Sequence, residues 1–313
     1  MEKIICVAGP TASGKTRLAV ELARKYDGEV LSCDSMQIYR GMEIGTAAPT
    51  RDEMQGVPHH MIGMADPRED FSVGKYVDLA EPILQDILSR GKACIVCGGT
   101  GLYADSLLLG RTFAPCPSTG VREKLEQKAE ETGIEPLLAR LKAVDPEAGA
   151  RLHPSDRRRI IRALEVYLET GETISEHNRK TKLLPPRHEA VWLGLSFENR
   201  QDLYDRIDLR VEKMLEAGLL DEIRALLSSG VPPTATAMQA IGYKEFVDAL
   251  ENGGDLDAAI ALTQQRSRNY AKRQLTWLRR NEQIHWILQP REPDFSAVFQ
   301  QACANIPFFA QAK

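Results

Sequence analysis

The sequence has 313 residues, a length typical of about two domains. With 43% hydrophobic and 27% charged residues it has the composition of a globular protein with a sizeable core. The formal net charge of -4 gives no polyanion-binding signature to the whole chain, so any nucleic-acid site must come from local clusters. No run of about 20 apolar residues occurs, so we expect no membrane span. No signal-peptide pattern precedes the first predicted strand, and we expect a cytoplasmic protein.

The first predicted elements are a strand at residues 3–8 and a helix at residues 14–26, joined by a glycine-rich loop. The loop reads GPTASGKT and fits the phosphate-loop pattern G-x-x-x-x-G-K-[ST]. Its backbone N–H groups and the helix N-terminus can approach phosphate oxygens, and Lys15 adds a full positive charge. Thr16 offers a hydroxyl to a Mg²⁺ ion that bridges phosphate oxygens. A glycine turn that binds nothing is the alternative. The loop residues are Gly9, Pro10, Thr11, Ala12, Ser13, Gly14, Lys15 and Thr16.

The second predicted strand, residues 28–35, ends in Asp34-Ser35. Many phosphate-loop NTPases hold Mg²⁺ with an aspartate at the end of an apolar strand. Here the apolar strand ACIVCGG ends in glycine, so Asp34 is the carboxylate at a strand end near the loop. It could act as a water-mediated Mg²⁺ ligand or as a general base. A helix N-cap formed with Ser35 is the structural alternative.

A predicted helix at residues 75–91 leads to a third strand, which runs into the turn Gly98-Gly99-Thr100-Gly101. Cys94 and Cys97 have the C-x-x-C spacing of a redox or half-zinc motif, but no second pair accompanies them, so we expect buried strand thiols. The neighbouring histidines His59-His60 also lack a second ligand cluster, and we expect structural or surface side chains. All cysteines are expected to be free thiols in a reducing compartment; they are Cys6, Cys33, Cys94, Cys97, Cys116 and Cys303.

Strands alternating with helices predict an α/β fold, with a phosphate-loop NTPase-like core in which helices flank a parallel sheet. In such sheets ligands bind at the carboxyl ends of the strands. The phosphate loop, Asp34 and the turn at residues 98–101 all follow predicted strands. We therefore expect these three segments to converge on one site.

The pattern changes near residues 113–120, after which the chain reads as successive charged helices to about residue 183. A strand-like run returns at residues 190–197. We predict an inserted all-helical domain at residues 116–190, within a discontinuous core domain formed by residues 1–115 and 191–288. Residues 289–313 form a C-terminal tail without a strong pattern.

Two basic clusters stand out in this acidic protein. In the first, residues 156–171, Ile160, Ile161, Leu164 and Leu168 form an inward stripe, whereas Arg158 and Arg162 share another face. The second lies at residues 266–280, where the arginines divide between opposite helix faces. Each cluster fits a solvated face as well as a binding surface. Two together favour a polyanion partner.

Several segments occur in the order known from one enzyme family: GPTASGKT, DSMQIYRGMEIGTA, VPHHMI, GGTGLY, RRIIRALEVY, LYDRIDLRV, AIGYKE and YAKRQLTWLRR. In these the chain resembles the tRNA dimethylallyltransferases, also called tRNA isopentenyltransferases, over about residues 3–287. One departure is Ala48, where the family often has lysine.

The resemblance implies transfer of the dimethylallyl group from dimethylallyl diphosphate to N6 of an adenosine in tRNA. The target is the adenosine immediately 3′ of the anticodon, in tRNAs that read codons beginning with U. It also implies that Mg²⁺ is required, that the diphosphate leaves intact and that the protein is a monomer. Lys15 and Thr16 would neutralise the leaving diphosphate, with Arg206 and Arg210 as further clamps. Asp34 would take the proton from N6.

The resemblance further places RNA contacts on two parts of the chain. The target adenine is expected to flip out of the anticodon stack, and the helical insertion to grip the anticodon stem-loop. The residues expected to contact tRNA are Asp34, Ser35, Met36, Gln37, Thr100, Arg122, Arg158, Arg159, Ile160, Ile161 and Arg162.

Two other functions fit parts of the pattern. A phosphate-loop kinase of a nucleotide or small metabolite would share the loop and Mg²⁺, and would bind ATP with an arginine-rich lid. It leaves DSMQIY and the second basic cluster unexplained. A non-catalytic RNA-binding NTP sensor would keep its function after the substitution Asp34→Ala.

Overall fold

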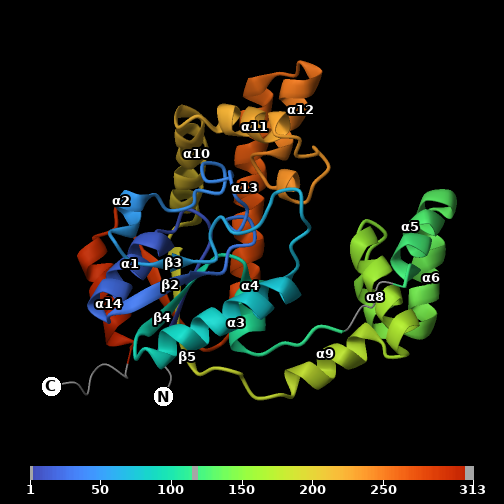
Figure 1. Cartoon of the computed structure of the whole chain (residues 1–313), viewed down its shortest axis with the longest axis horizontal. Helices are drawn as coiled ribbons and strands as arrows, with labels where there is room; N and C mark the ends of the chain where they lie inside the picture. Colours follow the sequence, from blue (N-terminus) through green and yellow to red (C-terminus); the bar gives the residue numbers. More distant parts are fainter. Residues whose placement is uncertain (1–2, 115–118, 307–313) are drawn as a thin grey trace. The chain divides into compact units, whose positions relative to one another are not determined.

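The structure is a computed structural model that describes residues 3–114 and 119–306. The chain divides into two compact units (Figure 1). The α/β unit comprises Met1–Leu109 and Arg187–Lys313, and the helical unit comprises Gly110–Pro186. The α/β unit is therefore discontinuous in sequence. The sequence placed the first boundary at residues 115 and 116, which lie outside the described residues, and the second a few residues after Pro186. Among the described residues no helix is long and apolar enough to cross a membrane.

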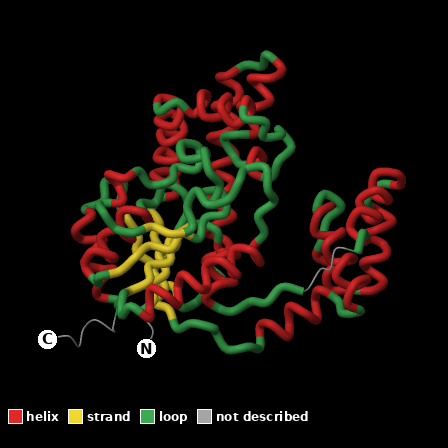
Figure 2. Tube along the Cα trace, viewed as in Figure 1, coloured by secondary structure: helices red, strands yellow, loops and turns green. Residues whose placement is uncertain are grey.

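The α/β unit is built on one sheet, whose strands are yellow in Figure 2. It has six strands in the order β3-β2-β4-β1-β5-β6, and every neighbouring pair is parallel. This confirms the predicted α/β fold with a parallel sheet. The strands are β1 (Ile4–Ala8), β2 (Gly28–Ser32), β3 (His59–His60), β4 (Ala93–Gly98), β5 (Ala190–Phe197) and β6 (Ile284–Gln289).

Helices cover both faces of this sheet. The helices of the α/β unit are α1 (Lys15–Lys25), α2 (Arg51–Met54), α3 (Val73–Ser89), α4 (Gly101–Leu108), α10 (Arg200–Glu216), α11 (Leu219–Ser228), the 3₁₀ helix η1 (Ala237–Gln239), α12 (Lys244–Asn252), α13 (Leu256–Leu278) and α14 (Phe295–Ala304).

The central strand β1 is buried on both faces, as its continuous apolar sequence predicts. Ile5 and Val7 pack on one face with apolar side chains of α1 and α14. Ile4 and Cys6 point to the other face and pack in the cluster that includes α3 and α4. Alternation along one strand thus divides the core between two helical layers.

Two elements near the C-terminus belong to the α/β unit although the sequence analysis did not predict them. Strand β6 pairs with β5 from Trp192↔Ile284 to Phe197↔Gln289. Helix α14 lies in the segment without a strong pattern, and its Val298 and Ala302 are buried in the same cluster as α1. The segment after residue 289 therefore covers part of the sheet.

The helical unit has its own apolar core. Ile160, Ile161 and Leu164 are buried there, as the predicted inward stripe requires. Leu168 is 38% exposed, which corrects its predicted inward position. The helices of this unit are α5 (Val121–Thr132), α6 (Glu135–Val144), α7 (Pro146–Arg151), α8 (Arg157–Thr170) and α9 (Ile174–Lys182).

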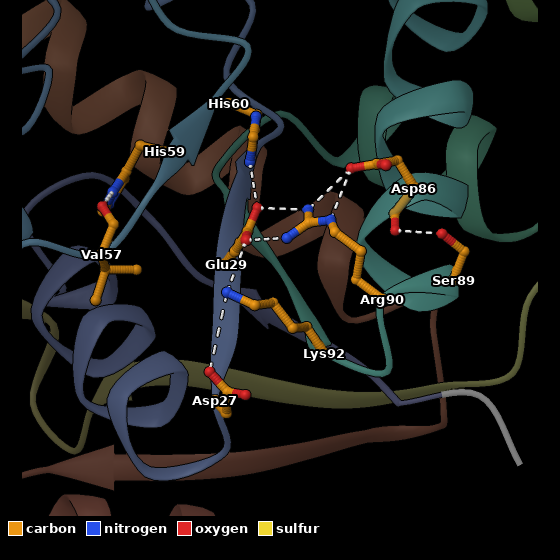
Figure 3. A network of polar contacts seen from close by, with 9 residues as sticks. All are labelled: Asp27, Glu29, Val57, His59, His60, Asp86, Ser89, Arg90 and Lys92. Atoms are coloured by element: carbon orange, nitrogen blue, oxygen red, sulfur yellow. Dashed lines mark hydrogen bonds and ion pairs between the residues drawn. The ribbon is translucent and has the colours of Figure 1, made fainter.

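A charge network centred on buried Glu29 joins β2, β3, the end of α3 and the start of β4 (Figure 3). Arg90 binds the Glu29 carboxylate at 2.5 and 2.9 Å, Lys92 Nζ lies 3.1 Å from it, and His60 Nε2 lies 2.8 Å from it. Hydrogen bonds from Arg90, the largest cause, hold the pKa of Glu29 well below its usual range. His59 Nδ1 contacts the carbonyl oxygen of Val57 at 2.8 Å. Both histidines therefore make structural contacts.

The thiols lie where the strand pattern places them. Cys94 is fully buried in β4, and Cys97 is half-buried at the carboxyl end of that strand. Every cysteine within the described residues is a free thiol, and Cys116 lies outside those residues.

Candidate active site

A cavity of about 310 Å³ opens at the carboxyl ends of the parallel strands, within the α/β unit. The three segments expected to converge all line it, through Thr11, Lys15 and Thr16 of the phosphate loop, Asp34 to Gln37, and Gly98. Helices α10 and α13 complete the wall, together with residues 45–47 and 239–242. The sheet topology thus produces the convergence that the sequence predicted.

The phosphate loop connects β1 directly to α1 and is tightly packed beneath the cavity. A Cβ atom on Gly9 would lie 2.6 Å from the carbonyl oxygen of Leu195, so only glycine fits there. Gly14 has φ 87°, the left-handed conformation that starts α1. Because α1 begins at Lys15, the positive end of the helix dipole points at the loop. This is the arrangement that binds phosphate oxygens in a strand–loop–helix unit.

Lys15 is held within the loop rather than in solvent. Its Nζ donates a hydrogen bond to the carbonyl oxygen of Pro10 at 2.6 Å. Burial, the largest cause, lowers the pKa of Lys15 to about 8; the charge of nearby Arg210 acts in the same direction and the charge of Asp34 opposes it. A bound anion would favour the charged form of this lysine.

The arginines that line the cavity are not paired with carboxylates of the described residues. Arg210 also lines the cavity, and burial lowers the pKa of its guanidinium against the opposing effect of Asp34. Arg273 of α13 is a third cation in the wall and lies 5.5 Å from the ring of Tyr270. Within the described part of the chain, neither Arg210 nor Arg273 makes an ion pair closer than 4.0 Å. The cavity could therefore bind an anion through these positively charged side chains.

Arg206, the second predicted clamp, is placed differently. Its Nε donates a hydrogen bond to the carbonyl oxygen of Ala12 at 3.2 Å, and its guanidinium lies 5.4 Å from the ring of Phe197. The side chain is exposed and is not among the cavity-lining residues. In this structure Arg206 supports the phosphate loop from outside.

Asp34 forms the turn that follows β2 and also faces the cavity. Its Oδ1 accepts hydrogen bonds from the backbone N–H groups of Met36 at 2.9 Å and Gln37 at 3.3 Å. Its Oδ2 makes no hydrogen bond to a described residue. The predicted helix N-cap alternative is wrong, because no helix begins at these residues; one oxygen of Asp34 caps a turn instead, and the other oxygen remains available for chemistry.

The other predicted base-contacting residues surround Asp34. The N–H of Ser35 donates to Oγ1 of Thr100 at 3.1 Å, which ties the Asp34 turn to the turn after β4. The Gln37 amide donates to the carbonyl oxygen of Ala47 at 3.2 Å, and Met36 lines the cavity. Ala48, where the family often has lysine, is not among the lining residues.

Three polar side chains that support the site were assigned no role from the sequence. Gln289 of β6 donates to the carbonyl oxygen of Ser13 at 2.9 Å, and Gln274 of α13 accepts from the N–H of Thr11 at 2.9 Å. Glu222 of α11 accepts from the N–H groups of Ile44 at 2.8 Å and Gly45 at 3.0 Å. Of the three, only Gln274 lies in a segment, YAKRQLTWLRR, that the sequence analysis singled out for its family resemblance. The other two depend on tertiary contacts.

The remaining predicted tRNA contacts lie in the helical unit. Arg122 binds the buried carboxylate of Glu165 at 2.9 and 2.8 Å, and Arg162 binds it at 3.0 Å. Arg158 and Arg159 are exposed, and Arg159 lies 3.5 Å from Asp156.

Two residues of the predicted tRNA-contacting segment have buried side chains, and their contact with RNA stays a prediction. Ile160 and Ile161 are 0% and 2% exposed in the core of the helical unit. Their side chains are enclosed by apolar neighbours. The apolar character of both residues is explained by the packing of α8 in this core.

Comparison with known proteins gives a consistent result. The family model described as IPP transferase matches residues 37–281, and the one described as isopentenyl transferase matches residues 2–63. A tRNA dimethylallyltransferase of Acetivibrio thermocellus is 44% identical over 92% of this chain and 92% of its own length. The chain belongs to the tRNA dimethylallyltransferase family.

Solved structures of this family resemble the present one. The tRNA isopentenylpyrophosphate transferase of Bacillus halodurans has a TM-score of 0.73 and 38% identity, with 99% of each chain covered. A eukaryotic dimethylallyltransferase acting on tRNA has a TM-score of 0.82 and 31% identity, covering 97% of this chain and 77% of its own. The family assignment therefore holds for the fold as well as for the sequence.

Proposed function

We propose that the protein transfers the dimethylallyl group of dimethylallyl diphosphate to N6 of the adenosine immediately 3′ of the anticodon, in tRNAs that read codons beginning with U. One observation carries this proposal: the same cavity is lined by Lys15 and Arg210, which form no ion pair with a described residue, and by the Asp34 carboxylate. A diphosphate leaving group and an amine that loses a proton need this pair of environments. The named activity of the relatives supports the same reaction.

The reaction would proceed by displacement at the allylic carbon. The nitrogen–carbon bond forms as the carbon–oxygen bond breaks, and the diphosphate leaves with the electron pair. Lys15, Arg210 and the loop N–H groups stabilise the charge that develops on the leaving group. The adenine amine is a weak nucleophile because its lone pair is delocalised into the ring. Asp34 Oδ2 would accept the N6 proton as the new bond forms.

Magnesium is part of the proposal, with Thr16 as its protein ligand. The Thr16 side chain lines the cavity beside Lys15, and a hydroxyl is a ligand that Mg²⁺ accepts. Within the described residues no group of three or more His, Cys, Asp or Glu side chains could hold a metal. This fits an ion that takes most of its ligands from phosphate oxygens and water. When bound, Mg²⁺ would neutralise part of the diphosphate charge.

The partner is proposed to be the anticodon stem-loop of tRNA. The target base would leave the stack to reach Asp34, with Ser35, Gln37 and Thr100 beside it. In the helical unit, exposed Arg158 and Arg159 are the cations best suited to contact RNA phosphates. We further propose that the protein is a cytoplasmic monomer.

A transfer assay tests the proposal. The protein, Mg²⁺ and radiolabelled dimethylallyl diphosphate are mixed with an unmodified anticodon stem-loop that carries consecutive adenosines after the anticodon. We expect label in the RNA and a loss of about 10²–10⁴-fold in kcat for Asp34→Asn. Asparagine keeps an oxygen that can cap the turn, so the loss reports on proton transfer.

The matched control is Asp78→Asn on the exposed face of α3, which should keep full activity. Two results would contradict the proposal. Absence of label in RNA together with ATP binding and phosphate transfer to a small molecule would favour a kinase. Unchanged transfer in Asp34→Asn would remove Asp34 as the base.

A further inference from the structure

Helix α13 presents a row of polar side chains to the cavity. Thr263, Ser267, Tyr270 and Gln274 all line it, and their spacing of four, three and four residues places them on one helix face. The two nearest the phosphate loop contact the segments that follow the strands.

Gln274 uses both ends of its amide. The side chain is 5% exposed; its Oε1 accepts from the N–H of Thr11 at 2.9 Å, and its Nε2 donates to the carbonyl oxygen of Gly99 at 2.9 Å. The fit is close, because a Cβ atom on Gly99 would lie 2.1 Å from that Nε2. Gln274 therefore joins the loop after β1 to the turn after β4.

Tyr270 extends this connection to the segment after β2. Its side chain lines the cavity, and its hydroxyl lies near the side chains of Thr100 and Gln274, which both influence its pKa. Thr100 Oγ1 in turn accepts from the N–H of Ser35 at 3.1 Å and donates to the Ser35 hydroxyl at 3.3 Å. Burial, the largest cause, raises the pKa of Tyr270 to about 12, so the hydroxyl keeps its proton at neutral pH. Through Gln274, the adjoining residues Gly99-Thr100 and the Thr100 hydroxyl, hydrogen bonds connect Thr11 to Ser35, the residue next to Asp34.

We propose that Gln274 and Tyr270 are positioning residues that set the separation between the diphosphate cradle and the Asp34 turn. The proposal rests on the proposed transfer reaction, in which the leaving group and the base act on opposite ends of the reacting atoms. A displacement of about 1 Å between such groups can lower a rate by about 10²-fold. The parallel sheet brings the three segments together, and the two α13 side chains fix their spacing. Neither side chain is required to touch the reacting atoms.

The test compares isosteric variants with a control on the same helix. Gln274→Met removes both hydrogen bonds at nearly constant volume, and Tyr270→Phe removes the hydroxyl alone. Gln264→Met is the control, because Gln264 Nε2 donates to the carbonyl oxygen of Asp208 at 3.4 Å, outside this network. The readouts are the single-turnover rate constant, the KM for dimethylallyl diphosphate and the melting temperature of each variant.

We expect Gln274→Met to lower the single-turnover rate constant by roughly 10–100-fold, while KM changes by less than about threefold. Tyr270→Phe should lower the rate constant by roughly 3–10-fold. The double variant should be little slower than Gln274→Met alone, because both side chains serve one connection. Gln274→Glu keeps an acceptor for Thr11 and should recover part of the rate. Gln264→Met should match the unmodified protein.

Several results would overturn the inference. A Gln274→Met variant that keeps half the rate constant, or that loses affinity alone, would show that the amide does not position the reacting groups. Additive effects in the double variant would separate the two residues. If Gln274→Met fails to fold, Tyr270→Phe with an unchanged melting temperature decides the question. Absence of transfer in the unmodified protein and in Gln264→Met together would instead refute the proposed function itself, and the inference with it.

Discussion

The cations of the cavity and the arginines of the helical unit differ in how the protein compensates their charge. Arg210 faces the cavity without an ion pair to any described residue, and the hydrogen bond that Lys15 Nζ makes within the described residues goes to the carbonyl oxygen of Pro10. In the helical unit, Arg122 and Arg162 converge on the buried carboxylate of Glu165, which is 6% exposed. Arginine is thus left without an ion pair beside the cavity in one region and is paired with a buried carboxylate in the other.

The two groups of cations differ because, among the described residues, only the arginines of the helical unit have a buried carboxylate, Glu165, as a partner. Removing charges from water is costly unless a partner compensates them, so Glu165 fixes the positions of the arginines around it. A cation that faces a cavity without such a partner keeps its charge for a ligand. In the helical unit, exposed Arg158 and Arg159 are therefore better candidates for RNA contacts than Arg122 and Arg162.

The largest expected effect comes from removing an uncompensated cation. Arg210→Gln should lower kcat/KM for dimethylallyl diphosphate by about 10²–10³-fold, because the charge on the leaving diphosphate loses a stabilising partner. Steady-state transfer kinetics measure it. Arg224→Gln is the control, since Arg224 pairs with Asp221 on the surface of α11 and should be neutral. A loss below about fivefold for Arg210→Gln would place the diphosphate elsewhere.

Lys15 should give the activity a pH dependence. Since its pKa is lowered to about 8, its charged fraction falls as pH rises through that value. We expect kcat/KM for dimethylallyl diphosphate to fall about tenfold per pH unit above that pKa. In Arg210→Gln the inflection should move to higher pH, because the positive charge of Arg210 lowers the pKa of Lys15. If kcat/KM instead stays constant up to the usual pKa of lysine, near 10.5, this expectation is contradicted.

Glu165 should matter for stability. Glu165→Gln leaves the guanidinium groups of Arg122 and Arg162 without their carboxylate, and we expect a loss of about 1–3 kcal/mol in the free energy of unfolding. Denaturant unfolding and hydrogen exchange of α5 and α8 measure it. Glu130→Gln removes an exposed pair with Arg157 and should cost below about 1 kcal/mol. Equal effects of the two variants would end the distinction between buried and exposed carboxylates.

The smallest expected effect is on RNA affinity. Joint substitution of Arg158 and Arg159 by glutamine should weaken stem-loop binding by roughly 3–10-fold and reduce its salt dependence, without changing the melting temperature. Binding titrations at several salt concentrations measure it. Arg122→Gln should do the reverse and lower stability more than affinity. If Arg122→Gln weakens binding more than the double variant, the helical unit uses its paired arginines after all.

Local patterns predicted much of the α/β unit. The apolar strand, the loop GPTASGKT and the helix after it specify β1 and α1 with little help from other segments. Parallel strands also share a carboxyl edge, which is why Asp34 and the turn after β4 could be placed beside the loop. These predictions depend on short-range sequence and on a general rule of sheet geometry.

The missed features depend on contacts between distant segments. Strand β6 has no regular alternation, with His285 and Leu288 exposed, and its position is defined by pairing with β5. Gln274 is an ordinary polar residue of a long helix until the fold brings Thr11 and Gly99 to its amide. The pairing of Arg122 with Glu165 likewise joins residues that are far apart in the sequence. A single sequence contains no local signal for pairings between such distant segments.

The order of strands also has a consequence for biosynthesis. Strand β1 emerges first, yet one of its edges pairs with β5, from Ile4↔Ala190 to Ala8↔Gly194. The whole helical unit is synthesised in between, and that unit has its own apolar core. During synthesis on the ribosome, β1 therefore has one edge unpaired until β5 emerges, while the inserted helices can already fold. Nascent chains halted before residue 190 should be the species most in need of chaperone protection.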